Sequence, residues 1–329
     1  MSPKPTLLHF PKLLLAIGLP AIASQPLLAQ QNYPVKPVRL VVASSPGGGP
    51  DIVARMVATK LGPALGQQVI VDNKPGAGTM IGSEFVVRSA PDGHTLIMHG
   101  AAMIFVPITH KKAPYDAVKD FAPIARIASL PFVLTVHPSV PVKSVKGLVA
   151  LARAKPDALN YASAGIGSSP HLAMELFLGM AHVRMVHIPY KGTGAGIVDL
   201  VAGQVSVMMP NILTALPHIR TNRLRALGVT GSKRAAVLPD IPAIAEAGMA
   251  GYEAVQWYGV LAPAGTPKEI IARLNTEIVR VARMPEIRNR LSSDGAEIIG
   301  DSPGQFAAFV ALETEKWAKV VRAAGIKPQ

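Results

Sequence analysis

The chain has 329 residues, which allows two α/β domains, and its 49% apolar content is ample for two hydrophobic cores. Aromatic residues make up only 5%, so packing must rely on small and branched aliphatic side chains. The 33 basic against 20 acidic residues give a formal net charge of +13, which suits nucleic acid, an anionic membrane surface or a small anion. The basic residues are scattered, without a dense block or interleaved aromatic residues, which disfavours nucleic acid as a partner.

The N-terminus has the layout of a secretory signal peptide. Lys4 and Lys12 flank the start of an apolar stretch at 13–28, which ends before Ala29. The stretch is too short and too weakly flanked for a membrane-spanning helix, and its prolines disfavour a buried core helix. We predict that residues 1–29 are removed. Because the chain has no cysteine for a lipid anchor, we expect a soluble, exported and unanchored protein.

Apolar β-prone runs then alternate with segments of helical periodicity. In the first half, the pattern predicts strands at 38–43, 68–72, 95–99 and 122–128, with helices at 50–65 and 80–90. A strand at 132–136 crosses into a second copy, which predicts helices at 145–155, 170–180 and 195–202 and strands at 159–163, 184–188, 205–209 and 224–230. The remainder predicts a strand at 260–262 and helices at 268–283 and 303–324.

This alternation predicts parallel sheets built from right-handed βαβ units. We therefore expect two doubly wound α/β domains joined by a hinge. The first domain is discontinuous, residues 33–130 plus 253–329, and the second, residues 131–252, is inserted between its parts.

Two strand-to-helix turns share one chemical layout. The first turn, residues 47–51, reads Gly-Gly-Gly-Pro-Asp, and the second turn, residues 167–171, reads Gly-Ser-Ser-Pro-His. Proline at the first helical position starts a helix whose N–H groups point back toward the loop, and small residues leave those groups open to an anion. Ligands of α/β sheets gather at the carboxyl ends of strands, so the two turns predict one cleft for a small acid.

Each of these residues also has a purely structural interpretation. The glycines of the first turn could form a tight turn with positive φ. The role of Asp51 could be limited to complementing the helix dipole, and His171 could be a hydrogen-bonded surface imidazole. Trp257 could be a core residue, as a lone tryptophan in apolar surroundings usually is. The sequence leaves both interpretations open.

Enzymatic and metal-binding alternatives have less support. The first turn lacks the Lys-Ser/Thr pair of a nucleotide P-loop and the spacing of a dinucleotide fingerprint. Neither Ser168 nor Ser169 lies in a Gly-x-Ser-x-Gly elbow, and there is no cysteine nucleophile. His182 and His187 should not converge on a metal. We expect the protein to have no enzymatic activity and to bind no cofactor or metal. A Ser/His/Asp hydrolase stays an open alternative, because the residues of such triads meet in the fold and need no fixed spacing in the sequence.

A series of short motifs in fixed order covers nearly all of the mature chain. The main segments are Pro46-Gly47-Gly48, Asp72 to Gly78, Ala90 to Gly93, Pro114 to Asp116, Asn160-Tyr161, Gly165 with Gly167-Ser168, His171-Leu172, Pro189 to Gly192, Gly203 to Val205, Leu224 to Leu227, Leu238 to Asp240 and Leu261 to Pro267. In this order they resemble the Bug family of periplasmic solute receptors, which serve tripartite tricarboxylate transporters. No single motif would suffice, but the ordered series is specific.

The resemblance implies a type II periplasmic binding fold of the Venus-flytrap kind. It implies a carboxylate held between the first loops of the two domains, largely by backbone N–H groups and bridging waters. The implied ligand-binding residues are Gly47, Gly48 and Asp51 in the first domain, Ser163, Gly165, Gly167, Ser168 and His171 in the second, and Gly76, Gly78, Gly100, Tyr190, Lys191, Gly192 and Trp257 at the rim. The implied partners are the ligand and membrane permease subunits, and we expect a monomer.

The chain departs from the family pattern at two places. Ser44 and Ser45 stand where relatives often have an aromatic residue, which suggests a more polar ligand contact beside the first turn. Ser206 stands where relatives often have an acid, which favours an anionic or neutral-tailed ligand. The predicted function is capture of a small carboxylate and its delivery to a permease. The alternative from another class is a sensor that docks onto a sensor-kinase ectodomain.

Overall fold

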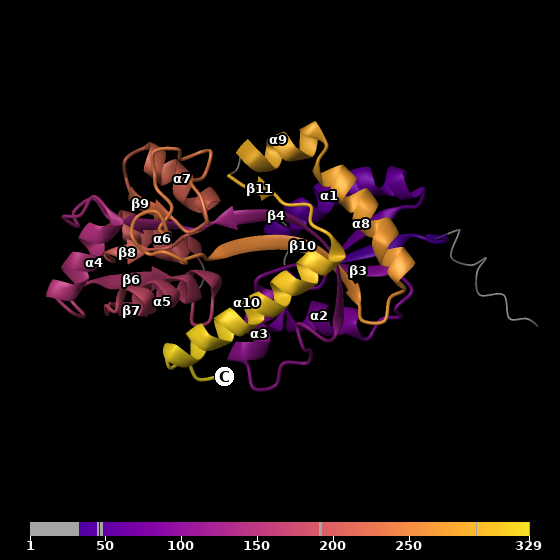
Figure 1. Ribbon diagram of the computed structural model, residues 1–329, viewed down its shortest axis with the longest axis horizontal. Coiled ribbons are helices and arrows are strands. Elements are labelled where there is room, and N and C mark those ends of the chain that lie inside the picture. Colours follow the sequence, from indigo (N-terminus) through magenta and orange to yellow (C-terminus); the bar gives the residue numbers. More distant parts are fainter. Residues whose placement is uncertain (1–32, 45, 47–48, 191–192, 294, 329) are drawn as a thin grey trace, which may run out of the picture. The chain divides into compact units, whose positions relative to one another are not determined.

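The computed structural model describes residues 33–44, 46, 49–190, 193–293 and 295–328, and the predicted signal peptide lies outside them. Two β-sheets, of six and five strands, organise the chain (Figure 1). Pro34–Gln329 form one compact unit, apart from Met1–Tyr33. Strands from 38–131 and 255–298 build the first sheet, and strands from 133–229 build the second. The predicted domain boundaries near residues 130 and 252 stay a prediction.

The six-stranded sheet has the order β11-β4-β10-β3-β1-β2. Its strands are β1 (Val38–Val42), β2 (Val69–Asn73), β3 (Thr95–Gly100), β4 (Phe121–Pro131), β10 (Val255–Pro263) and β11 (Glu297–Ile298). β1 pairs in parallel with β2 and β3, as predicted. β10 runs antiparallel to β3 and β4, and β11 antiparallel to β4. The prediction of a wholly parallel sheet is wrong here. β10 brings the chain back from the second sheet and lies between β3 and β4, which both run in the opposite direction.

Helices cover both faces of this sheet (Figure 1). The helices are α1 (Gly49–Leu65) and α8 (Lys268–Ala282) on one face, and α2 (Met80–Val87), α3 (Ala102–Thr109) and α10 (Pro303–Ala323) on the other. A short 3-10 helix, η1 (Ala77–Thr79), precedes α2, and α9 (Pro285–Ser293) follows α8. α8 buries Ile270, Leu274 and Ile278, the spacing of one helical face.

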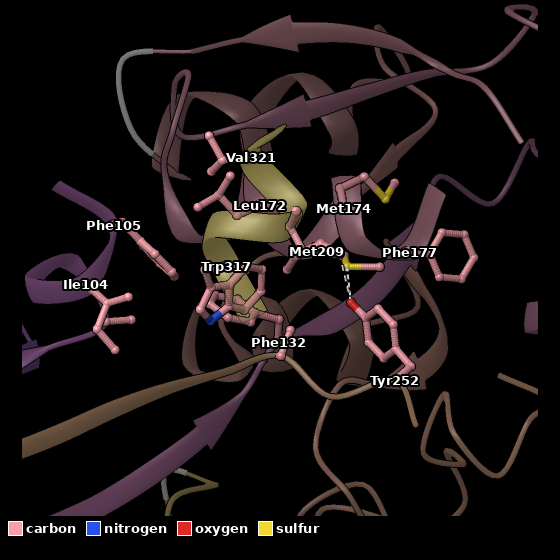
Figure 2. Close-up of a cluster of buried hydrophobic side chains, with 14 of the residues drawn as sticks. Ile104, Phe105, Phe132, Leu172, Met174, Phe177, Met209, Tyr252, Trp317 and Val321 are labelled. Carbon is pink, nitrogen blue, oxygen red and sulfur yellow. Dashed lines mark hydrogen bonds between the residues drawn. The ribbon is translucent and has the colours of Figure 1, made fainter. Parts of the chain in front are cut away.

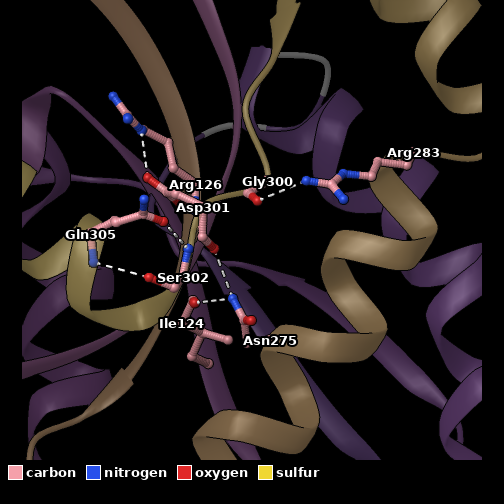
Figure 3. A network of polar contacts seen from close by, with 8 residues as sticks. All are labelled: Ile124, Arg126, Asn275, Arg283, Gly300, Asp301, Ser302 and Gln305. Atoms are coloured by element: carbon pink, nitrogen blue, oxygen red, sulfur yellow. Dashed lines mark hydrogen bonds and ion pairs between the residues drawn. The ribbon is translucent and has the colours of Figure 1, made fainter.

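A polar network around Asp301 fixes α8 and α10 to β4 (Figure 3). Asp301 accepts hydrogen bonds from the Arg126 backbone N (2.8 Å) and Nε (3.1 Å). Asn275 Nδ2 on α8 donates to the Asp301 carbonyl at 2.9 Å. Ser302 and Gln305 form a capping box that begins α10. The network therefore sets where the long C-terminal helix starts.

The five-stranded sheet has the order β7-β6-β8-β5-β9. Its strands are β5 (Val133–Val136), β6 (Asn160–Ser163), β7 (Val186–Pro189), β8 (Val207–Met208) and β9 (Arg225–Val229), and its helices are α4 (Val145–Ala154), α5 (Ser169–Ala181), α6 (Thr193–Val201) and α7 (Ile212–Arg220). β6 pairs in parallel with β7 and β8. β5 is antiparallel to β8 and β9, so the parallel prediction fails for this crossover strand as well.

One hydrophobic cluster contains side chains from both sheets and from α3, α5 and α10. The Phe105 ring of α3 meets the Trp317 ring of α10 edge to face, with centroids 5.2 Å apart (Figure 2). Leu172 of α5 belongs to the same cluster, and the Tyr252 hydroxyl donates to the Ala173 carbonyl at 2.9 Å. The C-terminal helix thus packs on α3 and on α5.

Thr230, the residue that follows β9, joins the two segments that connect the sheets. Its side chain is fully buried. Phe132 N donates to Thr230 Oγ1 at 2.7 Å, and Thr230 Oγ1 donates to the Ala254 carbonyl. Backbone bonds from Thr230 N to Phe132 O and from Ala254 N to Thr230 O, both 3.0 Å, complete the junction. A single threonine therefore ties together the outgoing and the returning chain.

Among the described residues, three α-helices, the short 3-10 helix η1 and one strand were not predicted. α3 and α7 contain Pro107 and Pro217, which conceal the helical pattern. α9 and β11 are short, and β10 begins at Val255 rather than at 260. Within the described ranges, no helix has the length and apolarity needed to cross a bilayer.

Candidate functional site

A cavity of about 450 Å³ opens between the second turn, α3 and β10. Gly78, Gly167 and Ser168, all predicted, line it. Its unpredicted lining includes Phe105 and Thr109 on α3, Phe132, Asn211, and Gln256 and Tyr258 on β10. The lining is mainly apolar and neutral polar, which suits one small ligand held by a few oriented hydrogen bonds.

In the first turn, Ser45, Gly47 and Gly48 lie outside the described residues. Asp51 is described, and it is 3% exposed. Its carboxylate accepts hydrogen bonds from Arg55 Nε at 3.0 and 3.1 Å and from Asn73 Nδ2 at 2.9 Å. Asn73 Nδ2 also donates to the Ser44 carbonyl at 3.1 Å. Asp51 therefore links the start of α1 to the ends of β1 and β2, and its charge is compensated by Arg55.

The Ser44 side chain differs from its neighbours in this network. Its Oγ is buried and has no hydrogen-bond partner among the residues that the structure describes. A buried hydroxyl without a partner is costly unless water or ligand bonds to it. The prediction that Ser44 contacts the ligand is compatible with this position, and it stays a prediction.

Close approaches of β10 explain two glycines. A Cβ at Gly49 would lie 2.2 Å from Tyr258 Oη, so the tyrosine hydroxyl rests against the start of α1. A Cβ at Gly100 would lie 2.6 Å from both Gln256 Nε2 and the Trp257 carbonyl. Gly100, predicted at the rim, therefore allows β10 to pair closely with β3. Burial raises the pKa of Tyr258 to about 12, so its hydroxyl stays protonated.

The predicted residues of the second turn come together, but they bond mainly to one another. Gly165 N donates to Ser163 Oγ at 3.1 Å, and Gly167 N donates to His171 Nδ1 at 3.0 Å. Ser168 N and Oγ both donate to the Gly165 carbonyl, at 3.2 and 2.6 Å. Gly165 and Gly167 have φ of 122° and 75°, which only glycine adopts readily. These three N–H groups shape the turn rather than point at a ligand.

The donors that remain belong to the first turn of α5. Its N-cap, Ser168, makes no side-chain cap bond, and Pro170 has no N–H. The N–H groups of Ser169 and His171 have no carbonyl to bond to within the helix. Because Ser169 and Pro170 line the cavity, this helix start presents its positive dipole end to it.

Three stacked rings lie beneath the second turn. His171 lies 4.0 Å from His187 and His187 lies 4.8 Å from Tyr161, measured between ring centroids. The Tyr161 hydroxyl donates to Glu175 Oε1 in a short hydrogen bond. Burial, with a smaller contribution from His187, lowers the pKa of His171 to about 4. Burial also lowers the pKa of His187 and raises that of Glu175. His171 is therefore neutral at pH 7.

The other rim residues have varied positions. Gly76, the N-cap of η1, and Gly78, within η1, have positive φ of 125° and 64°. The Tyr190 hydroxyl donates to Asp199 Oδ2 at 2.7 Å. Lys191 and Gly192 lie outside the described residues.

Trp257 does not lie at the rim. Its side chain is fully buried, with its ring edge to face against Phe306 at 5.3 Å and Phe309 at 5.8 Å between centroids. Successive side chains of a strand point to opposite faces, so Gln256 and Tyr258 face the cavity while Trp257 faces the core. The expectation of Trp257 at the rim is therefore wrong. Its neighbours Gln256 and Tyr258 line the cavity instead, and strand alternation was the signal that could have identified them.

α3 was missed, and with it Thr109. A Cβ at Gly167 would lie 3.4 Å from Thr109 Cγ2, so the end of α3 lies against the second turn. On the other side, Ser169 Oγ is 3.4 Å from Gln256 Oε1, a long hydrogen bond that joins α5 to β10. These two contacts close the cavity around the second turn.

The hydrolase alternative gains no support from these contacts. The hydroxyls of Ser168 and Ser169 bond to the Gly165 carbonyl and to Gln256. The buried serine Ser163 contacts His187 Nε2 at 2.7 Å, but this pair stabilises the turn from below. In the part of the chain that the structure describes, no three His, Cys, Asp or Glu residues are grouped as metal ligands.

The chain is similar to known proteins over most of its length. Residues 53–326 match the tripartite tricarboxylate transporter family receptors. Protein BugT of Bordetella pertussis is 35% identical over 302 residues, which are 91% of this chain and 93% of BugT. The solved structure of R. palustris Rpa4515 with adipate is 36% identical, with a TM-score of 0.77, and the match covers 90% of this chain and 100% of that one. MatC from Rhodopseudomonas palustris, solved with bound malate, is 33% identical with a TM-score of 0.73, covering 88% and 100%. The fold is that of a two-domain type II periplasmic binding protein.

Proposed function

The chain belongs to the tripartite tricarboxylate transporter receptor family, and from this premise we propose that it captures a small carboxylate in the cavity beside the second turn. The observation that carries the proposal is the start of α5, where the N-cap Ser168 makes no side-chain cap bond and Ser168, Ser169 and Pro170 line that cavity. Helix N-termini with free N–H groups stabilise anions. Two similar receptors, Rpa4515 and MatC, were solved with adipate and malate, which are carboxylates.

The binding geometry follows from the cavity's chemistry. A carboxylate at α5 would accept from the N–H groups of Ser169 and His171, while Gln256 on β10, which contacts Ser169, supplies an amide beside them. Phe105 and Phe132 exclude water and so strengthen these hydrogen bonds. A micromolar dissociation constant corresponds to about −8 kcal/mol, which several such bonds in a shielded cavity can supply. Preferential affinity for a closed form would shift the population toward that form.

The decisive experiment measures ligand binding to stripped protein. Isothermal titration against a panel of mono-, di- and tricarboxylates, including adipate and malate, should give at least one micromolar ligand, and its methyl ester should bind far more weakly. If no carboxylate binds and a turnover assay instead detects chemistry on the ligand, the receptor proposal is wrong.

A matched pair of variants localises the site. Gln256→Glu adds a negative charge inside the cavity and should weaken carboxylate binding at least tenfold, about 1.4 kcal/mol. Gln68→Glu adds the same charge at an exposed position outside this cavity and should leave affinity within twofold. Equal effects of the two substitutions would place the ligand elsewhere.

Delivery and location complete the proposal. The receptor acts in the periplasm as a monomer, performs no chemistry on its ligand, and hands the ligand to the membrane permease of a tripartite transporter. Mass spectrometry of the exported protein should find a new N-terminus near residue 30, and light scattering should give the mass of one chain. Pull-down with and without ligand should recover permease subunits only with ligand, whereas recovery of a sensor kinase would favour the sensory alternative.

A further inference from the structure

The ring of His171 lies directly beneath the second turn. The residue is 4% exposed, and its Nδ1 accepts the Gly167 N–H at 3.0 Å. Because Nδ1 is the acceptor, the neutral ring carries its proton on Nε2. That nitrogen faces Glu175 Oε1 at 3.7 Å, and a carboxylate there favours this tautomer.

The surroundings hold the ring in place. His187 stacks on it with planes 12° apart, and Ser163 Oγ in turn bonds to His187 Nε2. Tyr161 also stacks against His187, with ring centroids 4.8 Å apart, and donates its hydroxyl to Glu175. The direction of the Nδ1 lone pair is therefore set by β6, β7 and α5 together.

Gly167 is the point at which this ring acts on the cavity. It lines the cavity, has φ of 75°, and lies against Thr109 of α3. The next residues are Ser168, the N-cap of α5, and Ser169, the first residue of the helix. The orientation of the Gly167 peptide therefore determines how the helix start meets a ligand.

We propose that His171 is a positioning residue of the ligand site, whose Nδ1 lone pair holds the Gly167 N–H and so keeps the second turn in the carboxylate-binding form, and that a proton on Nδ1 releases the ligand. Protonated Nδ1 is a donor facing the Gly167 donor, so the hydrogen bond is lost and the turn must rearrange. The inference rests on the proposed carboxylate-receptor function.

The groups around the ring set the pH at which this happens. His187 on β7 and burial both oppose a charge on His171, and its pKa is lowered to about 4. Glu175 on α5 and Tyr161 on β6 share a hydrogen bond. On α10, which also packs on α5, Lys316 pairs with Glu313 and Lys319 with Glu315, and Arg322 lies in the last turn of the helix. The ring is therefore a neutral acceptor at pH 7 and changes only in acid.

Two substitutions separate the lone pair from the ring. His171→Asn places an amide oxygen near the Nδ1 position and keeps an acceptor for Gly167. His171→Phe keeps a ring that stacks on His187 but removes the acceptor. The dissociation constant would be measured by titration with adipate, malate and the other carboxylates of the panel, after thermal unfolding has shown that each variant is folded.

At pH 7, His171→Phe should bind at least about tenfold more weakly than the wild type, since the Gly167 N–H loses its partner, and His171→Asn should stay within about threefold. Between pH 6 and pH 4, the ratio of the wild-type to the His171→Asn dissociation constant should about double, and it should rise further below pH 4. Protonation of the ligand affects both dissociation constants equally, so it cancels in their ratio. The ratio does not involve His171→Phe, so it can be measured even if that variant does not fold.

The outcomes are distinguishable. If the wild type binds no carboxylate, the proposed function fails and this inference fails with it. If the wild type binds but folded His171→Phe binds equally well, or if His171→Asn loses affinity in acid as the wild type does, only the positioning role is overturned. Imidazole ¹⁵N spectra give a direct check, because they should show His171 Nδ1 without a proton at pH 7.

Discussion

Replacing Gly49 with alanine places a methyl group where the Tyr258 hydroxyl lies. The new Cβ would be 2.2 Å from Tyr258 Oη and 2.9 Å from Cζ, distances that real Cβ atoms essentially never show. Gly49 is not among the residues with positive φ, so the backbone itself accepts alanine. The whole cost is therefore steric, and it falls on the wall of the proposed ligand cavity.

The magnitude follows from how tightly Tyr258 is held. Its side chain is 6% exposed, so the ring cannot swing into solvent and must shift by about 1 Å within a packed site, which costs about 1–3 kcal/mol. Tyr258→Phe removes Oη but leaves Cζ at 2.9 Å from the new methyl group. The double variant should therefore recover part of the loss, with a coupling energy of about 1 kcal/mol.

The assay is urea unfolding of the four proteins in the double-mutant cycle, with carboxylate titration in parallel. Gly179→Ala is the matched control. This glycine lies in α5, and no neighbouring atom lies within 4 Å of the place that an alanine Cβ would take, so the substitution should be neutral or stabilising by up to about 1 kcal/mol. A Gly49→Ala protein that unfolds at the wild-type urea concentration, or a zero coupling with Tyr258→Phe, would refute the close contact.

Three further predictions concern other residues. Trp257→Phe should lower the free energy of unfolding by about 1–3 kcal/mol yet leave carboxylate affinity within twofold, since the ring packs in the core. A large loss of affinity would show instead that Trp257 contributes to the ligand site. Thr230→Val should cost about 2–4 kcal/mol in urea unfolding because Phe132 N and Ala254 O both lose its hydroxyl, and Thr230→Ser should restore most of it; equal values for the two variants would contradict the junction. The pKa of both His99 and His171 is lowered from 6.5 to about 4, so between these pH values the unfolded chain binds protons that the native protein does not. Stability should therefore fall as the pH drops from 6.5 to 4, by up to about 1.4 kcal/mol per pH unit for each histidine, and a pH-independent urea midpoint over this range would contradict the burial of the two rings.

Local patterns were enough for much of the framework. The alternation of apolar strands and amphipathic helices predicted β1, α1, β2, β6 and α5 close to their observed bounds, because periodicity and proline at helix starts act within a few residues. The same local chemistry singled out the second turn, which lines the proposed ligand cavity. It failed for α3, where Pro107 conceals a helix that packing against α10 stabilises.

The direction of each strand and the surroundings of each side chain could be read only from the tertiary structure. Nothing local tells whether β10 runs with or against β3, because that depends on where the chain returns from. The same holds for Trp257, which strand alternation turns into the core while its neighbours face the cavity.

The sequence by itself determined that two strands are each followed by a turn that starts a helix, one turn in each half of the chain. It also determined the resemblance to solute receptors. Only the tertiary structure decided what the polar groups of those turns bond to. The Asp51 carboxylate accepts hydrogen bonds from Arg55, which also balances its charge, and from Asn73. The Gly167 N–H donates to His171 Nδ1. The physical reason is that turn formation depends on neighbours in the chain, whereas satisfying a buried donor or charge depends on whichever group the fold brings within hydrogen-bond distance.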